Sequence, residues 1–268
     1  MILSEALSPS DVIRLRHAMA QAGTRRFFTC FKRLLQARLK FDTFLLFRFD
    51  PGTVPQVLDS WIKPKSLPLD VLDEYVEGFY RLDPFFQLKD IPAKGLTTRL
   101  SDIAPDRFFS SEYYLQYYRR TRICEEVGLL APLPSGSVAH LSLSRLETTG
   151  PYRRRELQCL MHYSPVLMEL LTTHCSRFET GKRLKTPDSA PPLLDQIILT
   201  QVYETLGLKL TRREAQIAGL VLQGHSNGSA ALLLGISKET SKVHRRNLYR
   251  KLDISSQREL FTLLRHLL

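Results

Sequence analysis

Apolar residues recur every three or four positions in several stretches of the chain, a spacing typical of amphipathic helices. Four long stretches show it: Ser10–Lys40, Leu69–Tyr80, Asp106–Arg120 and Tyr152 to about Glu179. The second stretch is expected to end near Asp83-Pro84, because the residue before a proline avoids the α region. The pattern therefore predicts helices at both ends and in the middle of the first 180 residues.

Strands are predicted where apolar and aromatic residues run continuously or alternate with polar ones. Phe41–Asp50 is aromatic and apolar up to the turn at Pro51-Gly52, and Gln56–Trp61 is placed to pair with it across that turn. Val127–Leu133 and Ser137–Leu146 are two further candidates. The order of helices and strands predicts an α+β domain, with an antiparallel sheet flanked by helices, of the GAF or PAS sensor type.

Short helices with clear start and stop signals follow near the C-terminus. Thr211-Arg212-Arg213-Glu214 and Ser256-Gln257-Arg258-Glu259 have the spacing of capping boxes, in which a hydroxyl and a glutamate satisfy free backbone amides. Gly224 and Gly235 are placed to end helices, since glycine accepts the left-handed conformation. Ser237 can cap the next helix, which runs to about Lys251. Four short helices with a tight turn between the second and third predict an all-α helix-turn-helix domain.

The third of these helices separates into an inward and an outward face. The positions that repeat at three and four are expected to face inward: Ser241, His244, Leu248 and Leu252. The outward side carries cationic and hydrogen-bonding side chains suited to phosphates and base edges, and a small apolar one suited to thymine methyl groups. The residues predicted to bind DNA are Lys242, Val243, Arg246, Thr240, Arg245, Tyr249 and Arg250.

The C-terminal motifs resemble the LuxR-type (GerE-type) helix-turn-helix over roughly Leu208–Leu268, in register and without gaps. The motifs are Leu210-Thr211-x-Arg213-Glu214, Gly224-x-Ser226-Asn227, Leu234-Gly235-Ile236-Ser237, Thr240-x-Lys242-x-His244 and Lys251-Leu252. The resemblance implies a four-helix domain that binds DNA as a dimer, with Lys242, Val243 and Arg246 at the positions that meet DNA. It also implies that His244 is structural and that the terminal helix, Ser256–His266, helps dimerisation.

The chain departs from that family's pattern at the second helix and under the third. The family usually has a Lys-Glu-Ile-Ala run where this chain has Gly228-Ser229-Ala230-Ala231, and Gly228 weakens the start of that helix. The family also favours valine at the inward position that Ser241 occupies. A smaller, polar residue there lowers the burial of apolar area, so we expect a less stable domain with the same fold.

The distribution of charge points to a polyanionic partner for the same region. The chain of 268 residues carries a net charge of +11, and the part from Gly207 onward holds 11 Lys and Arg against 4 Asp and Glu, or +7. A surplus of this kind favours nucleic acid as a partner. The N-terminus lacks the order of a signal peptide, no apolar run reaches the length of a membrane span, and the four cysteines show no zinc-type pair. These features predict a cytoplasmic protein that does not contact membranes.

The length suits one large and one small domain. Gly181–Pro192 holds three prolines and no periodicity, so we expect a regulatory domain over residues 1–180, a linker over 181–192 and a DNA-binding domain over 193–268. A phosphoacceptor receiver fits the first domain poorly, because Phe41–Asp50 offers one acid at its end, Asp50, and the prolines that follow make a poor receiver helix.

Asp83-Pro84 resembles the Asp-Pro of acyl-homoserine-lactone receptors, whose carboxylate binds the ligand amide. The tryptophan and tyrosine of that family would fall near Asp70 and Glu74; Tyr75 replaces the tyrosine with a shift of one residue, and the indole is missing. Several stretches look more like LuxR-type regulators with GAF-like sensors of unassigned ligand. An effector pocket needs aromatic walls and a few polar anchors, and the best candidates are Trp61, Tyr75, Tyr80 and Asp83.

No catalytic motif is present in the sequence, and none predicts a cofactor. Cys159 with His162, and His174-Cys175, are more easily read as buried cysteines and helix-surface histidines than as a metal or thiol sensor. The sequence thus predicts a non-enzymatic, ligand-responsive transcriptional regulator that binds double-stranded DNA as a homodimer and works with RNA polymerase. The alternatives are a lactone-type quorum receptor and a protein-binding regulator whose degenerate helix-turn-helix no longer holds DNA.

Overall fold

The computed structural model describes residues 7–64, 70–88, 91–178 and 193–265. Contacts divide the chain into two compact units, each assembled from separated stretches. The first unit comprises Met1–Leu67, Lys89–Asp102 and Arg122–Ser189, and the second Pro68–Leu88, Ile103–Thr121 and Ala190–Leu268. The expected linker, 181–192, lies outside the described residues, so the boundaries drawn from the sequence stay a prediction.

A five-stranded antiparallel sheet forms the centre of the first unit, in the order β2-β1-β5-β4-β3. The predicted hairpin is present, with Thr43 opposite Ile62 and a bulge between Leu46 and Phe47. The two later strands also pair with each other. Because β5 lies between β1 and β4, the pairing of β1 with β5 joins residues about a hundred positions apart in the sequence. The strands are β1 (Thr43–Phe49), β2 (Gln56–Ile62), β3 (Leu96–Arg99), β4 (Ile123–Pro132) and β5 (Val138–Leu146).

The edge strand β3 was missed by the sequence pattern. It has four residues, of which Thr98 is buried, and it pairs with Val127–Leu130 of β4. A segment this short carries too little alternation to be recognised, and it is a strand because β4 offers it hydrogen bonds. One short helix, α5 (Leu100–Ile103), follows it directly.

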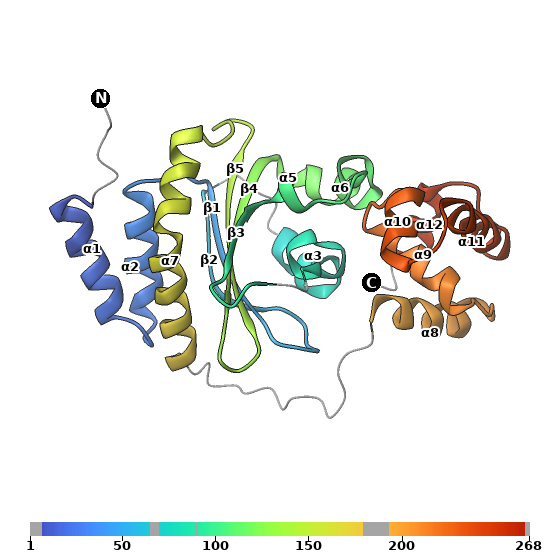
Figure 1. Cartoon of the computed structure of the whole chain (residues 1–268), viewed down its shortest axis with the longest axis horizontal. Helices are drawn as coiled ribbons and strands as arrows, with labels where there is room; N and C mark the ends of the chain where they lie inside the picture. The colour runs from blue at the N-terminus through green and yellow to red at the C-terminus, as the bar shows by residue number, and fades with distance from the viewer. Residues whose placement is uncertain (1–6, 65–69, 89–90, 179–192, 266–268) are drawn as a thin grey trace. The chain divides into compact units, whose positions relative to one another are not determined.

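Three helices lie on one side of the sheet, with α1 packed on the outside of α2 (Figure 1): α1 (Pro9–Ala20), α2 (Arg26–Gln36) and α7 (Arg154–Arg177). Their apolar sides and the sheet enclose the core, which includes Phe27, Phe31, Phe44, Leu141 and Leu171. The expected helix over Ser10–Lys40 is two helices. Gly23 separates them with φ +88°, and a Cβ there would lie 2.8 Å from the Cβ of Arg177.

Short helical pieces open the second unit. They are α3 (Val71–Glu77), the 3-10 turn η1 (Phe79–Leu82), α4 (Pro84–Gln87), η2 (Phe108–Ser110), α6 (Glu112–Gln116) and η3 (Tyr118–Thr121). The prediction of one helix over Asp106–Arg120 was wrong. Ser111 has an extended backbone and its hydroxyl accepts from the amide of Tyr114 at 3.1 Å, so a new helix starts there.

The remainder of the second unit is helical: α8 (Leu194–Leu206), α9 (Arg212–Leu222), α10 (Asn227–Leu234), α11 (Lys238–Lys251) and α12 (Gln257–Leu264). Helix α9 is central, because α8, α10, α11 and α12 all pack on it, and α10 also packs on α11. The capping box at Thr211 and Glu214 is complete. At the second box Ser256 accepts from the amide of Glu259, but Glu259 accepts from the amide of Ser255, one residue earlier than predicted.

The fold class is thus as predicted, an α+β part with an antiparallel sheet and a helical C-terminal part. Within the described residues, no helix is both long enough and apolar enough to pass through a bilayer.

Candidate DNA-binding surface and sensor site

The start and rotation of α11 are fixed by its cap and its buried side. Ser237 has an extended backbone, and its hydroxyl accepts from the amide of Thr240 at 3.0 Å, so α11 begins at Lys238. Ser241 and Leu248 are fully buried and Leu252 is 7% exposed, against α9 and α10. Three of the four residues expected to face inward are therefore buried, and His244 is half-buried.

The outward side of α11 borders a concave surface, here called the basic groove. Its cations are Lys242, Arg245, Arg246 and Arg250, and none of the residues that line it is acidic. Two members were not foreseen as DNA-binding residues, Asn227 at the start of α10 and Ile254 after α11, because they reach the groove only through packing. The groove is lined by Asn227, Lys242, Arg245, Arg246, Tyr249, Arg250 and Ile254.

Five of the seven residues predicted to bind DNA therefore share one surface. Thr240 and Val243 are exposed beside it, Val243 with 42% of its surface accessible. Among the described residues, Lys242 and Arg246 make no hydrogen bond or ion pair, whereas Arg250 donates to the amide oxygen of Asn247 at 3.3 Å. Unpaired cations on one concave face form an electrostatic site for a polyanion.

Arg245 is held in place by its neighbour one turn on. Its guanidinium donates to the hydroxyl of Tyr249 from Nε at 3.2 Å and from Nη2 at 2.9 Å, and it lies 5.1 Å from the ring centroid. The pair lies at i and i+4, which are neighbours on a helix surface. Arg245 is therefore oriented before any ligand binds.

An ion pair between a half-buried lysine and a buried glutamate connects the end of α11 to the start of α9. The Nζ of Lys251 donates to Oε2 of Glu214 at 2.8 Å, and the same carboxylate accepts from the amide of Thr211 at 2.7 Å. Burial acts to raise the pKa of Glu214, but the hydrogen bonds from Lys251 and Thr211 outweigh it and hold that pKa below its usual range. The pair helps to fix the angle at which α11 is presented.

Ser241 has no partner for its hydroxyl among the described residues. It makes no hydrogen bond to the carbonyl one turn earlier, the usual partner of a serine hydroxyl inside a helix. The side chain is fully buried where the LuxR-type pattern favours valine, so a polar atom occupies an apolar position. A buried hydroxyl without a partner costs free energy.

On the sensor side, Tyr75 and Asp83 form a buried pair. The hydroxyl of Tyr75 donates to Oδ2 of Asp83 at 2.6 Å, and the amide of Phe85 donates to Oδ1 at 2.9 Å, so Asp83 also caps α4. Burial, followed by the neighbouring Asp83 charge, raises the pKa of Tyr75. The ring of Tyr80 lies 6.5 Å from that of Tyr75, and Arg81 lies over it at 4.6 Å.

Trp61 has a different environment. It lies on β2, where its ring meets Phe41 edge-on at 5.9 Å and Lys32 lies 5.2 Å from its centroid. The structure therefore brings Tyr75, Tyr80 and Asp83 together in the second unit, whereas Trp61 is half-buried and packs against the core of the first unit.

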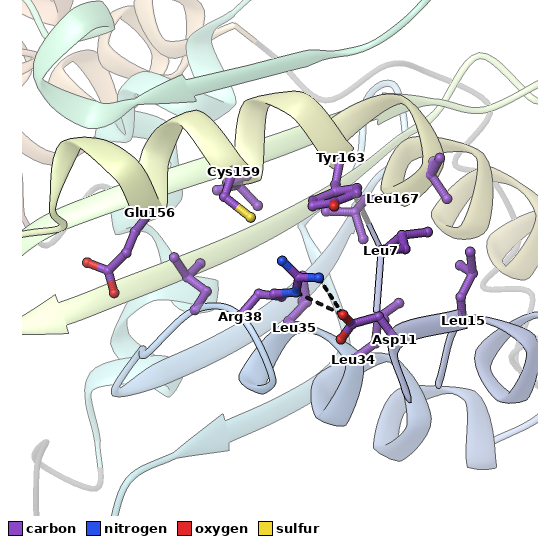
Figure 2. A pocket seen from close by; sticks show the side chains of 13 residues that line it. Leu7, Asp11, Leu15, Leu34, Leu35, Arg38, Glu156, Cys159, Tyr163 and Leu167 are labelled. Atoms are coloured by element: carbon purple, nitrogen blue, oxygen red, sulfur yellow. Dashed lines mark hydrogen bonds and ion pairs between the residues drawn. The ribbon is translucent and has the colours of Figure 1, made fainter. Parts of the chain in front are cut away.

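A small apolar cavity that the sequence did not reveal lies among α1, α2 and α7. In Figure 2, Asp11 and Arg38 point toward one another across it, and Nε of Arg38 donates to Oδ2 of Asp11 at 3.0 Å. The hydrogen bond from Arg38 is the main reason that the pKa of Asp11 lies below its usual range. The cavity measures about 60 Å³, whereas ligand pockets occupy about 300–1,000 Å³. It is too small for an effector.

On α7, Cys175 and His174 are buried, whereas Cys159 is half-buried and His162 is exposed, so the expectation of surface histidines was wrong for His174. His174 is fully buried, stacks on Phe27 at 4.0 Å and accepts from the amide of Gly23 at 3.0 Å on Nδ1. Burial lowers its pKa to about 4 and raises that of Cys175 to about 12. No group of three potential metal ligands occurs within the described part of the chain.

A capped helix with a buried inner face and an outer face of unpaired cations, supported by short helices, defines a helix-turn-helix protein. Residues 208–264 match the family of bacterial regulatory proteins called the luxR family. The HTH-type transcriptional regulator in the exeN 3' region of Aeromonas salmonicida is 34% identical over 189 residues, which span 69% of this chain and 95% of that protein. The chain belongs to the luxR family of transcriptional regulators.

Two further comparisons each concern one part of the chain. The response regulator TodT of Pseudomonas putida is 44% identical over 62 residues, which are 23% of this chain and 26% of that protein. The crystal structure of the LBD domain of VqsR from Pseudomonas aeruginosa covers 63% of this chain and 97% of that domain, with 20% identity and a TM-score of 0.52. That likeness concerns the fold of the sensor part.

Proposed function

We propose that the chain is a ligand-responsive regulator that binds a specific DNA sequence by placing α11 in the major groove. The observation that carries the proposal is the basic groove, where Lys242 and Arg246 are unpaired beside the exposed methyl groups of Val243. A helix with two free cations and one small apolar side chain meets the needs of base-edge reading. Arg250 and the pre-oriented Arg245 are suited to phosphates.

The protein acts in this proposal as a homodimer in the cytoplasm, with RNA polymerase as a further partner. Helix-turn-helix dimers bind two half-sites about one helical turn apart, so the operator is expected to be a palindrome. The proposal needs no cofactor, metal or catalytic step.

Selection of binding sites from a randomised duplex pool tests the DNA-binding part. The expected result is an enriched palindromic site whose affinity falls steeply with salt, because each neutralised phosphate contributes a slope of about −0.9 to log K against log salt. Arg154→Ala, an exposed arginine at the start of α7, is the control for general charge. An unenriched pool would favour the alternative, a protein-binding regulator whose helix-turn-helix no longer holds DNA.

The effector site is proposed around Tyr75, Tyr80 and Asp83. These residues combine aromatic surface with a buried carboxylate, which are the elements of a small-molecule site. Thermal-shift screening of metabolites and acyl-homoserine lactones against the full chain tests it, since a ligand at a hundred times its Kd adds about 2.7 kcal/mol. Stabilisation by lactones that Asp83→Asn abolishes would favour the quorum-receptor alternative.

A further inference from the structure

The surface formed by α1 and α2 is strongly basic. Residues 7–40 hold eight Lys and Arg against one acid, Asp11, a net of +7 that is as large as that of the chain from Gly207 onward. Asp11 is 3% exposed, and its carboxylate accepts from Arg38 and Arg14. Among residues 7–40, no acidic side chain is therefore exposed to balance the cations.

Large apolar side chains are exposed on the outer face of α1. Val12 and Ile13 each have 51% of their surface accessible, and Met19 has 58%. Val12, Arg16 and Met19 lie at i, i+4 and i+7, so they follow one line along the helix, and Ile13 lies next to Arg16 on the same face. The opposite side of α1 packs on α2 (Figure 1). The outer face is thus an apolar patch with an arginine in its middle.

Arg16 is suited to a carboxylate partner. It is exposed and makes no hydrogen bond or ion pair within the described residues. A guanidinium binds a carboxylate in a fixed, bidentate geometry, and an arginine among apolar side chains is typical of the centre of a protein interface. Arg25, Arg26 and Arg33 are also exposed and extend the positive charge beyond the end of α1 and along α2.

We infer that the outer face of α1, centred on Val12, Arg16 and Met19, is a docking site for an acidic amphipathic helix of a partner protein. Apolar side chains at helical spacing on the partner would contact the exposed apolar residues, and its carboxylates would meet the cations. The bond from Arg38 to Asp11 fixes α1 on α2, so the face is presented without rearrangement. The site shares no residue with the basic groove and goes beyond the proposed DNA binding.

The charge and the apolar residues together distinguish this partner from three others. A second copy of the chain would bring two surfaces of like charge together. A DNA duplex would pair with the cations through its phosphates and leave Val12, Ile13 and Met19 without apolar contacts. A helix that lies in a bilayer surface keeps its charges apart from its apolar face, whereas Arg16 lies between the apolar side chains. An acidic amphipathic helix satisfies both kinds of residue.

Binding of a designed peptide to the full chain tests the inference. The probe is a fluorescein-labelled peptide of about 18 residues, long enough to form a helix, with leucines at i, i+3, i+4 and i+7 and glutamates elsewhere. A peptide of the same composition in scrambled order is its control. Anisotropy should show saturable binding of the probe in the micromolar range and much weaker binding of the scrambled peptide.

Two pairs of matched variants locate the bound peptide. Val12→Ser and Arg16→Ala should each weaken binding about three- to tenfold. Val54→Ser, at a valine that is 48% exposed between β1 and β2, and Arg154→Ala, at the start of α7, should leave binding within about twofold. All four positions are exposed, so the melting temperatures should not change. Hydrogen exchange gives a second readout, since bound peptide should slow exchange in α1 and leave β4 and β5 unchanged.

Several results would overturn the inference. They are no saturable binding of the probe, equal binding of the scrambled peptide, or equal weakening by the control variants, the last two being signs of general electrostatics. Dissociation of a dimer by Val12→Ser would assign the face to a second copy. Loss of sedimentation with phosphatidylglycerol vesicles in that variant would assign it to a bilayer, and weaker binding of a mixed-sequence duplex by Arg16→Ala would assign it to DNA. Operator selection is a separate measurement, so failure here leaves the proposed function intact.

Discussion

Ser241→Val tests how α11 is rotated on its neighbours. The serine is fully buried in the first turns of α11, and its hydroxyl has no partner among the described residues. Valine replaces that hydroxyl with methyl groups of similar shape at a position that faces α9 and α10. If the rotation is right, the substitution should stabilise the helix-turn-helix without touching the basic groove.

The expected gain follows from three contributions. A buried hydroxyl left unsatisfied costs about 1–3 kcal/mol, which valine removes. The additional buried carbon contributes about 0.8 kcal/mol. Crowding and the lower helix propensity of a β-branched residue oppose these by about 1–2 kcal/mol. The net expectation is a stabilisation of about 1–2 kcal/mol, equivalent to a 5- to 30-fold change in the opening equilibrium.

Amide hydrogen exchange in the full chain measures this locally. Peptides from α9 and α11 should exchange about 5 to 30 times more slowly in Ser241→Val than in the wild type, while peptides of β1 and β5 should not change. Ser241→Ala is the matched variant, since it removes the hydroxyl and adds no bulk. It should stabilise the helix-turn-helix by about 1 kcal/mol. Faster exchange in both variants would mean that the hydroxyl is needed, and the assignment of Lys242 and Arg246 to the outer face would then be wrong.

Three further outcomes follow from other contacts. Arg246→Ala should weaken binding to a selected operator by about 1–3 kcal/mol and relax specificity at one base pair, whereas Arg154→Ala should not; equal effects in a titration would mean general electrostatics. Burial lowers the pKa of His174 from its ordinary 6.5 to about 4, so between pH 6.5 and pH 4 the imidazole is protonated in the unfolded state and neutral in the folded state. The free energy of unfolding should therefore fall by about 2–3 kcal/mol as the pH drops from 6.5 to 4. Urea unfolding of His174→Gln should show a flatter pH dependence; an unchanged slope would contradict the burial. Lys251→Met leaves the buried Glu214 carboxylate without its cation; because the ammonium group of Lys251 is partly screened by solvent, the free energy of unfolding should drop by about 1–2 kcal/mol at neutral pH. Since the pKa of Glu214 lies below its usual range, that difference should shrink as pH falls through the folded pKa, and a loss that persists in acid would refute the ion-pair account.

The C-terminal helices could be predicted closely because their signals are local. The hydroxyls of Thr211 and Ser237 bond amides three residues later, and Gly235 ends α10 with φ +63°. Each of these contacts joins residues only a few positions apart, so the local sequence determines it. The inward spacing of Leu248 and Leu252 likewise follows from helix geometry alone.

The central segment could not be predicted in the same way. The aromatic run from Asp106 to Arg120 has helical spacing, yet Ser111 caps a separate short helix. The spacing of apolar residues does not show where a side chain will cap a new helix, or which surfaces the segment will pack against. For Tyr75 and Asp83 the sequence identified two anchor candidates, and the structure adds that their side chains bond to each other at 2.6 Å.

The sequence by itself determined the family, the basic charge of the last sixty residues and the face of α11 that points outward. Tertiary structure alone decided that Asn227 and Ile254 join the basic groove, that Arg38 binds Asp11, and that the turn at Gly224 docks against Asp106–Phe108. The physical reason is the range of the interactions. Capping and helical periodicity act within four residues. These contacts join residues from 27 to 120 positions apart, so they form only when the chain folds into its tertiary structure.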